Sequence, residues 1–165
     1  MDLYNIESEY LDYLRRYDKK IPLQHSQLVN RPFVGIILIV NNINYFAPLS
    51  SPKEKHKTMK PNIDFLKISN GEYGVINLNN MLPAPINVCT AIKIKELKET
   101  EDLTLIKYAN LIANQKNWCT RNRDLINNRA QKLYDKSLNN RLPLNIKERC
   151  VDFKVVEKAM AEWCK

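Results

Sequence analysis

Eleven consecutive residues, 50–60, carry the side chains of this chain that are best suited to act on a phosphate ester. Their sequence is SSPKEKHKTMK, and it follows a short apolar run at 45–49. The segment contains two adjacent serine hydroxyls, four lysines and one histidine. Hydroxyl and ammonium groups can hold and neutralise phosphate oxygens, and an imidazole can transfer protons near neutral pH. The composition predicts a loop that binds and cleaves a phosphodiester, with a solvated surface turn as the alternative.

Such a loop can cleave RNA without a metal ion, because RNA carries its own nucleophile, the 2′-hydroxyl. The enzyme has to help this hydroxyl lose its proton, neutralise the phosphorane and help the 5′-oxygen leave. The products are a 2′,3′-cyclic phosphate and a 5′-hydroxyl, and DNA cannot react in this way. A non-catalytic RNA-binding protein is the alternative hypothesis. The candidate catalytic residues are Ser50, Ser51, Lys53 and His56.

The distribution of charge favours a polyanionic partner. The 165 residues carry a formal net charge of +8, and a second basic zone at 116–141 has seven bases against two acids. Two such zones can converge into one surface that binds phosphates without choosing a sequence. For the second zone, a solvated helix face is the alternative. The candidate RNA contacts in the two zones are Lys55, Lys57, Lys60, Lys116, Arg121, Arg123 and Arg129.

Motifs for metal-dependent or cofactor-dependent chemistry are absent from the sequence. The chain has two histidines, no HExxH motif, no cluster of carboxylates and no glycine-rich phosphate loop. Its four cysteines are far apart and form no CxxC pair, which is typical of structural thiols in a reduced, cytoplasmic protein. No apolar run reaches the length of a membrane span. We therefore expect no metal, no cofactor and no membrane partner.

The hydrophobic pattern predicts strands first and helices mostly later. This order favours an α+β fold, with a compact and mainly antiparallel sheet flanked by helices, in a single domain at 1–165. Apolar runs and turn signals predict strands at 33–40, 43–47, 63–68, 73–78 and 86–94, with a hairpin at 33–47. Helical spacing predicts a first helix ending near 18, and later helices at about 101–118, 120–138 and after 152. The expected capping residues are Asn5, Thr100 and Asp152.

Five segments of the chain resemble the endoribonuclease toxins of type III toxin–antitoxin systems, the ToxN/AbiQ/CptN group. The block at 45–56 is the most specific of the five, and the stretch at 115–147 matches less clearly. The segments are EYLDYLRRYDKKIP at 9–22, RPFVGIILI at 31–39, YFAPLSSPKEKH at 45–56, YGVINLNNMLPAP at 73–85 and VDFKVVEKAMAEW at 151–163.

The resemblance implies a fold similar to the Kid/MazF type of toxin and metal-independent cleavage of cellular or phage RNA. It also implies a small, repeated and folded RNA antitoxin, which the toxin processes and with which it closes into an assembly. In phage defence such systems act by abortive infection.

Residue by residue, the resemblance assigns the hydroxyl pair to Ser50 and Ser51 and the active-site lysine to Lys53. His56 matches a histidine of some relatives. Tyr10 and Arg31 match positions that contact RNA or the active site, although Tyr10 also lies on an apolar helical stripe and could belong to the core. A tyrosine that some members place before the first long strand has no clear match at 23–26, so His25 is given no catalytic role.

Overall fold

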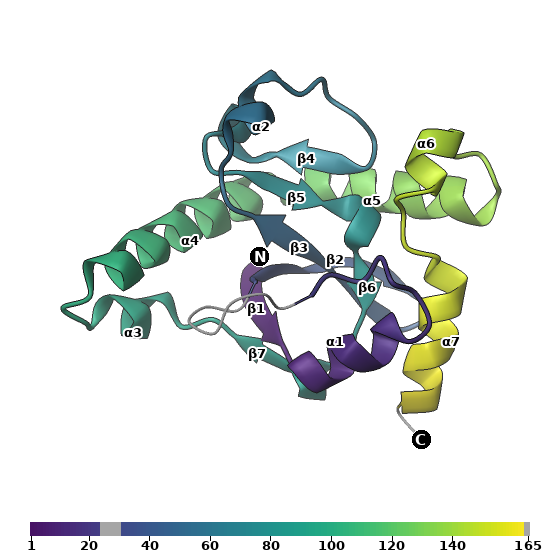
Figure 1. Ribbon diagram of the computed structural model, residues 1–165, viewed down its shortest axis with the longest axis horizontal. Coiled ribbons are helices and arrows are strands. Elements are labelled where there is room, and N and C mark those ends of the chain that lie inside the picture. The colour runs from purple at the N-terminus through teal and green to yellow at the C-terminus, as the bar shows by residue number, and fades with distance from the viewer. Residues whose placement is uncertain (24–30, 164–165) are drawn as a thin grey trace.

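The structure is a computed structural model, and it describes residues 1–23 and 31–163. Within these residues, seven strands form an antiparallel sheet in the order β4-β5-β3-β2-β1-β7, and β6 pairs with β3 beside this row. Figure 1 shows helices on both faces of the sheet. The predicted α+β class is therefore confirmed. The strands are β1 (Asp2–Ile6), β2 (Phe33–Val40), β3 (Ile43–Ser50), β4 (Phe65–Lys67), β5 (Val75–Asn77), β6 (Leu82–Pro83) and β7 (Cys89–Ala91).

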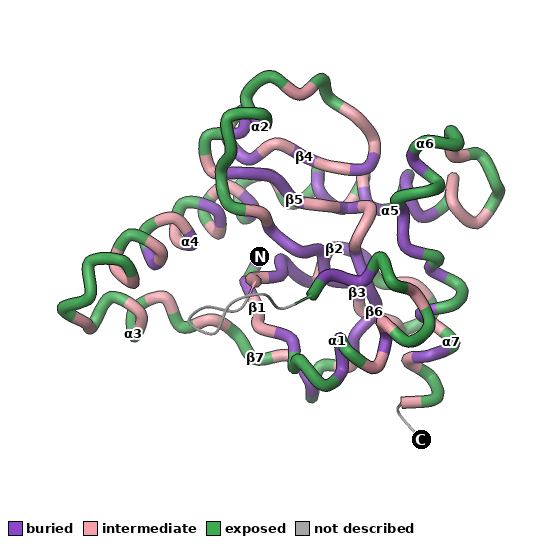
Figure 2. The backbone as a smooth tube through the Cα atoms, in the orientation of Figure 1, coloured by how far each residue is buried: buried purple, intermediate pink, exposed green. Residues whose placement is uncertain are grey.

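The β2–β3 hairpin forms the centre of the sheet. Val40 pairs with Ile43, and the two residues between them, Asn41 and Asn42, both have positive φ angles, of 49° and 64°. Asparagine adopts this left-handed conformation more readily than most residues, and two such residues match the twist of the flanking strands. The predicted hairpin is therefore confirmed. Figure 2 shows that buried residues concentrate along these two strands.

The longer helices are positioned by contacts with the sheet and with one another. α5 packs against β2, and α7 contacts α1, α5 and β6. α3 and α4 form a helical hairpin that projects to the left in Figure 1. The helices are α1 (Ser8–Arg15), α2 (Glu54–Thr58), α3 (Ile94–Lys98), α4 (Leu103–Arg121), α5 (Arg123–Leu138), α6 (Leu144–Lys147) and α7 (Phe153–Trp163), with short 3₁₀ turns at η1 (Ile68–Gly71), η2 (Leu78–Asn80) and η3 (Ile86–Val88).

The first strand was not predicted. Asn5, expected to cap the first helix, lies in β1 and pairs with Thr90 of β7. Leu3 and Ile6 are each 1% exposed, so pairing and burial stabilise an extended conformation that the local pattern does not reveal. The helix begins instead at Ser8.

The cap of α4 also differs from the prediction. The Asp102 carboxylate, not the Thr100 hydroxyl, accepts hydrogen bonds from the N–H groups of Thr104 and Leu105, at 2.7 and 3.4 Å. Thr100 instead accepts from the N–H of Asp102 at 3.2 Å. The predicted Asp152 cap of α7 is confirmed, because its carboxylate accepts from the N–H of Val155 at 3.2 Å.

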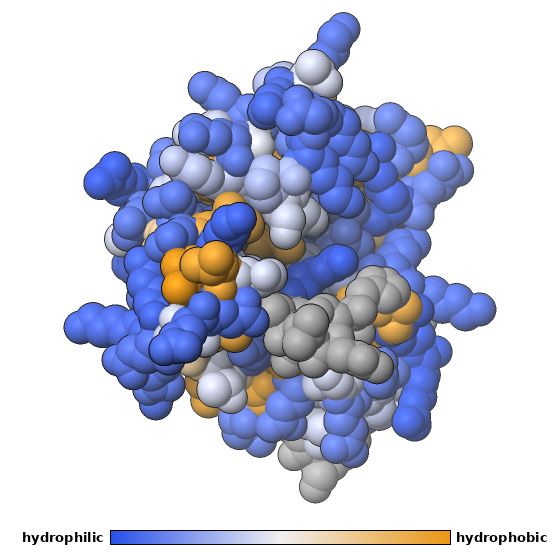
Figure 3. Space-filling view, turned by 60° about the vertical axis from the view of Figure 1, so that its left-hand side comes forward, coloured by the Kyte–Doolittle hydropathy of each residue, from blue (hydrophilic) through white to orange (hydrophobic). Residues whose placement is uncertain are grey.

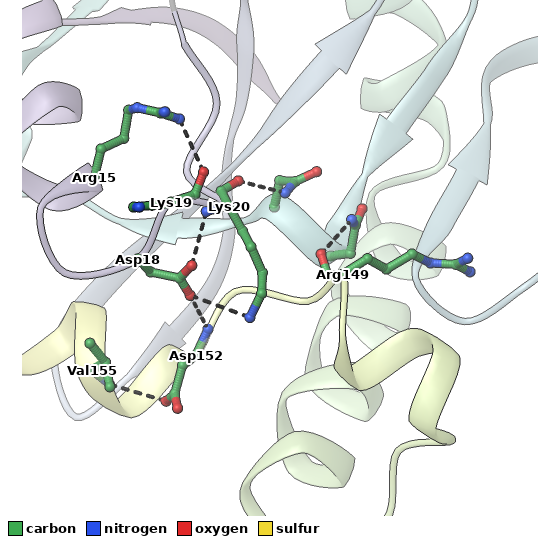
Figure 4. Close-up of polar contacts among 9 residues, drawn as sticks. Arg15, Asp18, Lys19, Lys20, Arg149, Asp152 and Val155 are labelled. Atoms are coloured by element: carbon green, nitrogen blue, oxygen red, sulfur yellow. Dashed lines mark hydrogen bonds and ion pairs between the residues drawn. The ribbon is translucent and has the colours of Figure 1, made fainter.

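Polar contacts fasten the segment after α1 to the start of α7 (Figure 4). The Asp18 carboxylate accepts from the backbone N–H of Lys20 at 2.9 Å and from that of Asp152 at 2.8 Å. The side chain of Asn80 donates to the Lys20 carbonyl at 2.8 Å, and that of Asn79 to the Arg149 carbonyl at 3.0 Å. These bonds satisfy backbone groups of segments far apart in sequence and hold the segment after α1 against the start of α7.

Tyr10 belongs to the core rather than to an exposed surface. Its side chain is fully buried, at 0% exposure, and its hydroxyl donates to the Pro83 carbonyl at 2.7 Å. Its ring packs edge-on against Trp163, with centroids 5.4 Å apart. This placement favours the core alternative over the predicted RNA contact.

We predict that Tyr10→Phe lowers the free energy of unfolding by about 1–3 kcal/mol, because the buried Pro83 carbonyl loses its partner. RNA affinity should not change. Tyr17→Phe is the matched control, because the Tyr17 side chain is 44% exposed, and it should cost much less. Denaturant unfolding and fluorescence anisotropy measure the two quantities. Loss of RNA affinity with unchanged stability would instead support an RNA contact.

Candidate active site

The candidate site is built at the end of the central strand β3. Ser50 is the last residue of β3 and pairs with Val75 of β5. On its other side, the Pro32 carbonyl accepts from the N–H of Leu49 at 2.8 Å, which extends the β2–β3 ladder by one residue. In this register the next residue, Arg31, lies across from Ser50. Partial burial lowers the pKa of the Arg31 guanidinium from its ordinary value. The structure thus brings two predicted site residues from different segments together.

The hydroxyl of Ser50 is oriented by an amide that the sequence did not single out. Asn77, at the end of β5, donates from Nδ2 to Ser50 Oγ at 2.8 Å and to the Pro48 carbonyl at 3.3 Å. Because Ser50 Oγ accepts this bond, its own proton is directed elsewhere and can be donated to a phosphate oxygen. Asn77 lies in the 73–85 segment of the resemblance, which was the available signal.

Ser51 and Lys53 are exposed at the start of the loop, and His56 is not. Lys53 immediately precedes α2. The His56 side chain is 3% exposed, and its Nδ1 accepts from the Lys53 N–H at 3.2 Å, while the His56 N–H donates to the Lys53 carbonyl at 2.8 Å. These two bonds close the first turn of α2. The geometry therefore makes His56 a capping residue of α2.

Burial and nearby charge keep His56 neutral. Burial is the larger effect, and the ammonium groups of Lys55, Lys53 and Lys67 add to it, so the pKa of His56 lies below its ordinary value of 6.5. Acceptance by Nδ1 also requires that this nitrogen carry no proton. The remaining ring nitrogen, Nε2, then carries the proton of the neutral tautomer.

Two glycines allow the backbone of the 71–74 segment to pack closely against the loop. A Cβ atom at Gly74 would lie 1.9 Å from the Ser50 carbonyl oxygen, and one at Gly71 would lie 2.6 Å from the His56 carbonyl oxygen. Both glycines have positive φ angles, of 92° and 95°, which other residues rarely adopt. Between them, the Tyr73 carbonyl accepts from Nε2 of Gln115, a buried residue of α4, at 2.8 Å. Sequence reasoning missed all three supporting residues.

The lysines of the loop are exposed but not equivalent. Lys55 and Lys60 extend from the surface. The ammonium of Lys57 lies 2.9 Å from the Glu54 carboxylate, and the Lys57 carbonyl accepts from the ammonium of Lys67 at 2.9 Å. Exposed ion pairs of this kind are weak, so Lys57 remains available to a polyanion. Lys67 is a cation of the site that the sequence did not identify.

The second basic zone does not form one surface. Lys116 lies 2.8 Å from the Asp2 carboxylate of β1 and, by this hydrogen bond, lowers the pKa of Asp2. Arg121 and Arg123 are exposed where α4 ends and α5 begins. Arg129 faces a different element and donates from Nη1 to the Asn62 carbonyl at 2.9 Å. The zone divides because successive helical residues point in different directions.

The face on which α3 and α4 project is mainly hydrophilic. Figure 3 shows it as a polar surface around a central hollow, with the largest of a few small groups of hydrophobic side chains beside the hollow. Among residues 1–23 and 31–163, no three His, Cys, Asp or Glu side chains gather into a possible metal site. None of the helices in the described part of the chain is long and apolar enough to span a membrane.

Comparison with known proteins identifies the family. The family of the toxin ToxN, from type III toxin–antitoxin systems, matches residues 2–161. The chain therefore belongs to this family, as the sequence resemblance indicated.

Two relatives match over most of their length. The endoribonuclease ToxN of Bacillus thuringiensis subsp. kurstaki is 29% identical over 164 residues, which cover 97% of this chain and 82% of the relative. The endoribonuclease AbiQ of Lactococcus lactis subsp. lactis is 28% identical over 167 residues, covering 93% and 84%.

A solved structure from work on selective toxin inhibition by a non-coding RNA pseudoknot, in bacterial type III systems, has a TM-score of 0.84. It is 28% identical and covers 99% of this chain and 98% of that one. The solved structure of AbiQ, at 24% identity, has a TM-score of 0.82, covers 99% and 97%, and supports the fold alone. The expected likeness to the Kid/MazF type stays a prediction.

We predict that His56 makes folding less favourable as the pH falls below 6.5. The unfolded chain then binds a proton that the folded chain, with its lowered His56 pKa, does not, so stability is lost down to the folded pKa. His56→Gln is the test, because a glutamine oxygen can still accept from the Lys53 N–H. Unfolding by denaturant between pH 5 and 7.5 should show less loss of stability for the variant. An identical pH dependence in the two proteins would contradict this prediction.

Proposed function

We propose that this protein is an endoribonuclease toxin that cleaves RNA through the 2′-hydroxyl of its substrate. The observation that carries the proposal is the position of the Ser50–Ser51–Pro52–Lys53 cluster at the end of β3. Asn77 orients the Ser50 hydroxyl there at 2.8 Å, and Arg31 lies across the ladder from it. A hydroxyl donor and a cation thus occupy neighbouring backbone positions at the edge of the core, which supports the proposal. The endoribonuclease names of the relatives support the same activity.

The arrangement suits transesterification. The 2′-oxygen forms a bond to phosphorus as the bond from phosphorus to the 5′-oxygen breaks, leaving a 2′,3′-cyclic phosphate and a 5′-hydroxyl. The cations of Lys53 and Arg31 neutralise the charge that develops on the phosphate oxygens, and the two serine hydroxyls orient those oxygens. The proton of the 2′-hydroxyl passes to a base, and the 5′-oxygen takes a proton from an ammonium or from water.

His56 is the candidate base in this scheme. A general base must be unprotonated at working pH, and the lowered pKa of His56 fulfils that condition. In the described geometry Nδ1 accepts from the Lys53 N–H and Nε2 carries the ring proton, so His56 accepts the 2′-hydroxyl proton at Nε2 only in the other tautomer, in which Nδ1 carries the ring proton and the Lys53 N–H loses its acceptor. Alternatively, the role of His56 is only to hold Lys53 in place. The His56→Gln variant distinguishes the two roles, because glutamine preserves the cap but has no imidazole to accept a proton.

We further propose that a folded, repeated RNA antitoxin inhibits and is processed by this toxin, closing with it into an assembly. The family supports this partner, as does the solved relative described with a non-coding RNA pseudoknot. The net charge of +8 supplies the physical support, because phosphate neutralisation dominates such binding. A cleaved end of the RNA held at Ser50–Lys53 would occupy the same phosphate positions as substrate, which accounts for inhibition.

We predict that Ser51→Ala and Lys53→Ala each lower RNA cleavage by about 10²–10³-fold, since each removes a donor to the developing charge. The toxicity of the protein expressed in cells should be lost together with RNA cleavage. Both side chains are exposed, so thermal unfolding should be nearly unchanged. Lys98→Ala, at another exposed lysine, is the matched control and should remain toxic. Full growth arrest by well-folded Ser51→Ala protein would remove Ser51 from the mechanism.

We also predict that cleavage survives chelation by EDTA and leaves a 2′,3′-cyclic phosphate and a 5′-hydroxyl. A substrate with one 2′-deoxy nucleotide at the scissile position should resist cleavage, because the nucleophile is missing. Mass spectrometry of the products and gel assays with the modified RNA provide the measurement. Products with 5′-phosphates, or activity that magnesium restores after EDTA, would refute this chemistry. RNA binding without any cleavage would favour the non-catalytic alternative.

A further inference from the structure

A basic groove lies beside the candidate active site, at the far end of β4. It has a volume of about 390 Å³ and runs between α5 on one side and residues 62–63 on the other, with the start of α6 at its end. Figure 1 shows the segment after α2 crossing the top of the molecule and descending toward α5 and α6 before β4 begins. The residues lining the groove are Asn62, Ile63, Arg129, Lys132, Lys136, Pro143 and Ile146.

Three cations line the groove from one helix. Arg129, Lys132 and Lys136 follow the i, i+3, i+7 spacing that places side chains on the same face of α5. At about 1.5 Å per residue they extend over about 10 Å of the helix axis, enough to meet more than one phosphate of a strand. None of the lining residues in the described chain is acidic. The groove therefore carries a concentrated positive charge.

Nearby carboxylates are engaged with other groups. Asp64, two residues beyond Asn62, is 3% exposed and holds the Nε of Arg149 at 2.7 Å. Asp135, the acid next to Lys136 on α5, accepts from the side chain of Gln131 at 2.8 Å. The groove cations make no ion pair with an acid among the described residues. Their side chains are thus available to an external anion.

Strand pairing sets the position of the groove relative to the candidate active site. Ser50 pairs with Val75, and Val75 pairs with Lys67 at one end of β4. Phe65, at the other end of β4, forms a bridge with Asn62 in the groove wall. With strands about 4.8 Å apart and a rise of about 3.3 Å per residue, the groove lies roughly 10–20 Å from Ser50. An RNA strand covers that distance with a few nucleotides.

We propose that this groove binds the phosphate backbone of the same RNA strand whose scissile phosphate lies at Ser50–Lys53. The proposal rests on the proposed function. It includes Lys132 and Lys136, which the distribution of charge along the sequence did not single out. It leaves out Lys116, which lies beside Asp2 instead. Lys60 and the segment at 61–62 lead from the active-site loop into the groove. Ile63 and Pro143 supply apolar contacts for ribose.

Binding tests the groove without requiring cleavage. The double variant Lys132→Glu/Lys136→Glu, in a Ser51→Ala background, is compared with Lys95→Glu/Lys98→Glu on the exposed α3 in the same background. Both double variants change the net charge by the same amount, so the two proteins have the same overall electrostatic attraction for RNA. Arg129 is left intact because it holds the Asn62 carbonyl. Circular dichroism and thermal unfolding establish that both variants fold.

Anisotropy with a single-stranded 15-nucleotide RNA, at several salt concentrations, gives the result. Each phosphate contact in a single strand contributes about 0.7 to the salt slope. Loss of two contacts should therefore reduce the slope by about 1.4, with affinity at least tenfold lower at low salt, for the groove variant only. Equal losses in the two double variants would overturn the proposal.

Cleavage separates this proposal from the proposed function. With Ser51 intact, the groove variant should cleave a dinucleotide as wild type does, because the single phosphate of a dinucleotide is the scissile one and no phosphate is left to reach the groove. It should show a raised KM and an unchanged kcat for the 15-nucleotide RNA. Equal effects on the two substrates would overturn the groove as a subsite. If wild type cleaved neither RNA, the proposed function would fail, while the salt slopes would still decide whether the groove binds RNA.

Discussion

The candidate active site depends on the burial of one strand, β3. This strand pairs with β2, β5 and β6, and its residues from Tyr45 to Leu49 are buried. A buried extended segment must pair its backbone groups with neighbours on both sides. The register of this pairing therefore determines where each residue of the strand lies. The point where β3 leaves the core is Ser50. The hydroxyl, imidazole and ammonium groups that follow are thus placed by the packing of residues that do no chemistry.

Close backbone contacts continue this control beyond the strand. Gly74 lies against the Ser50 carbonyl and Gly71 against the His56 carbonyl, so the 71–74 segment supports both ends of the first part of the loop. Gln115 fastens that segment to α4. A polar loop on the surface would otherwise sample many conformations, and ordering it at the moment of binding would reduce affinity. Support from below leaves the exposed hydroxyls and lysines preorganised for a phosphate.

The positions of the charged groups follow from this packing of β3 and of the loop after it. The lysines of the loop are exposed, where an ammonium keeps its hydration, and the groove cations are exposed or half-buried, whereas the buried imidazole of the loop, His56, is held neutral. Cations that pack near β1, such as Lys116, lie beside a carboxylate instead. The net charge alone therefore overestimates the extent of the surface proposed to bind RNA. The cations around β4 and α5 define a smaller surface.

The local features could be predicted from the amino-acid sequence: the 33–47 hairpin, the long helices, the cap at Asp152 and the Ser50–Lys53 cluster with its family, although residues 54–58 of the predicted loop form the helix α2. These depend on side chains close together in the chain, whose pattern is visible in one dimension. Only the tertiary structure decided that Asn5 lies in a strand, that Tyr10 is enclosed in the core and that Asn77 orients Ser50. It also decided that the 116–141 zone divides, leaving Arg129 in the groove with Lys132 and Lys136. These outcomes depend on strand pairing and helix orientation between residues far apart in the chain, which hydrophobic pattern and local propensity do not specify.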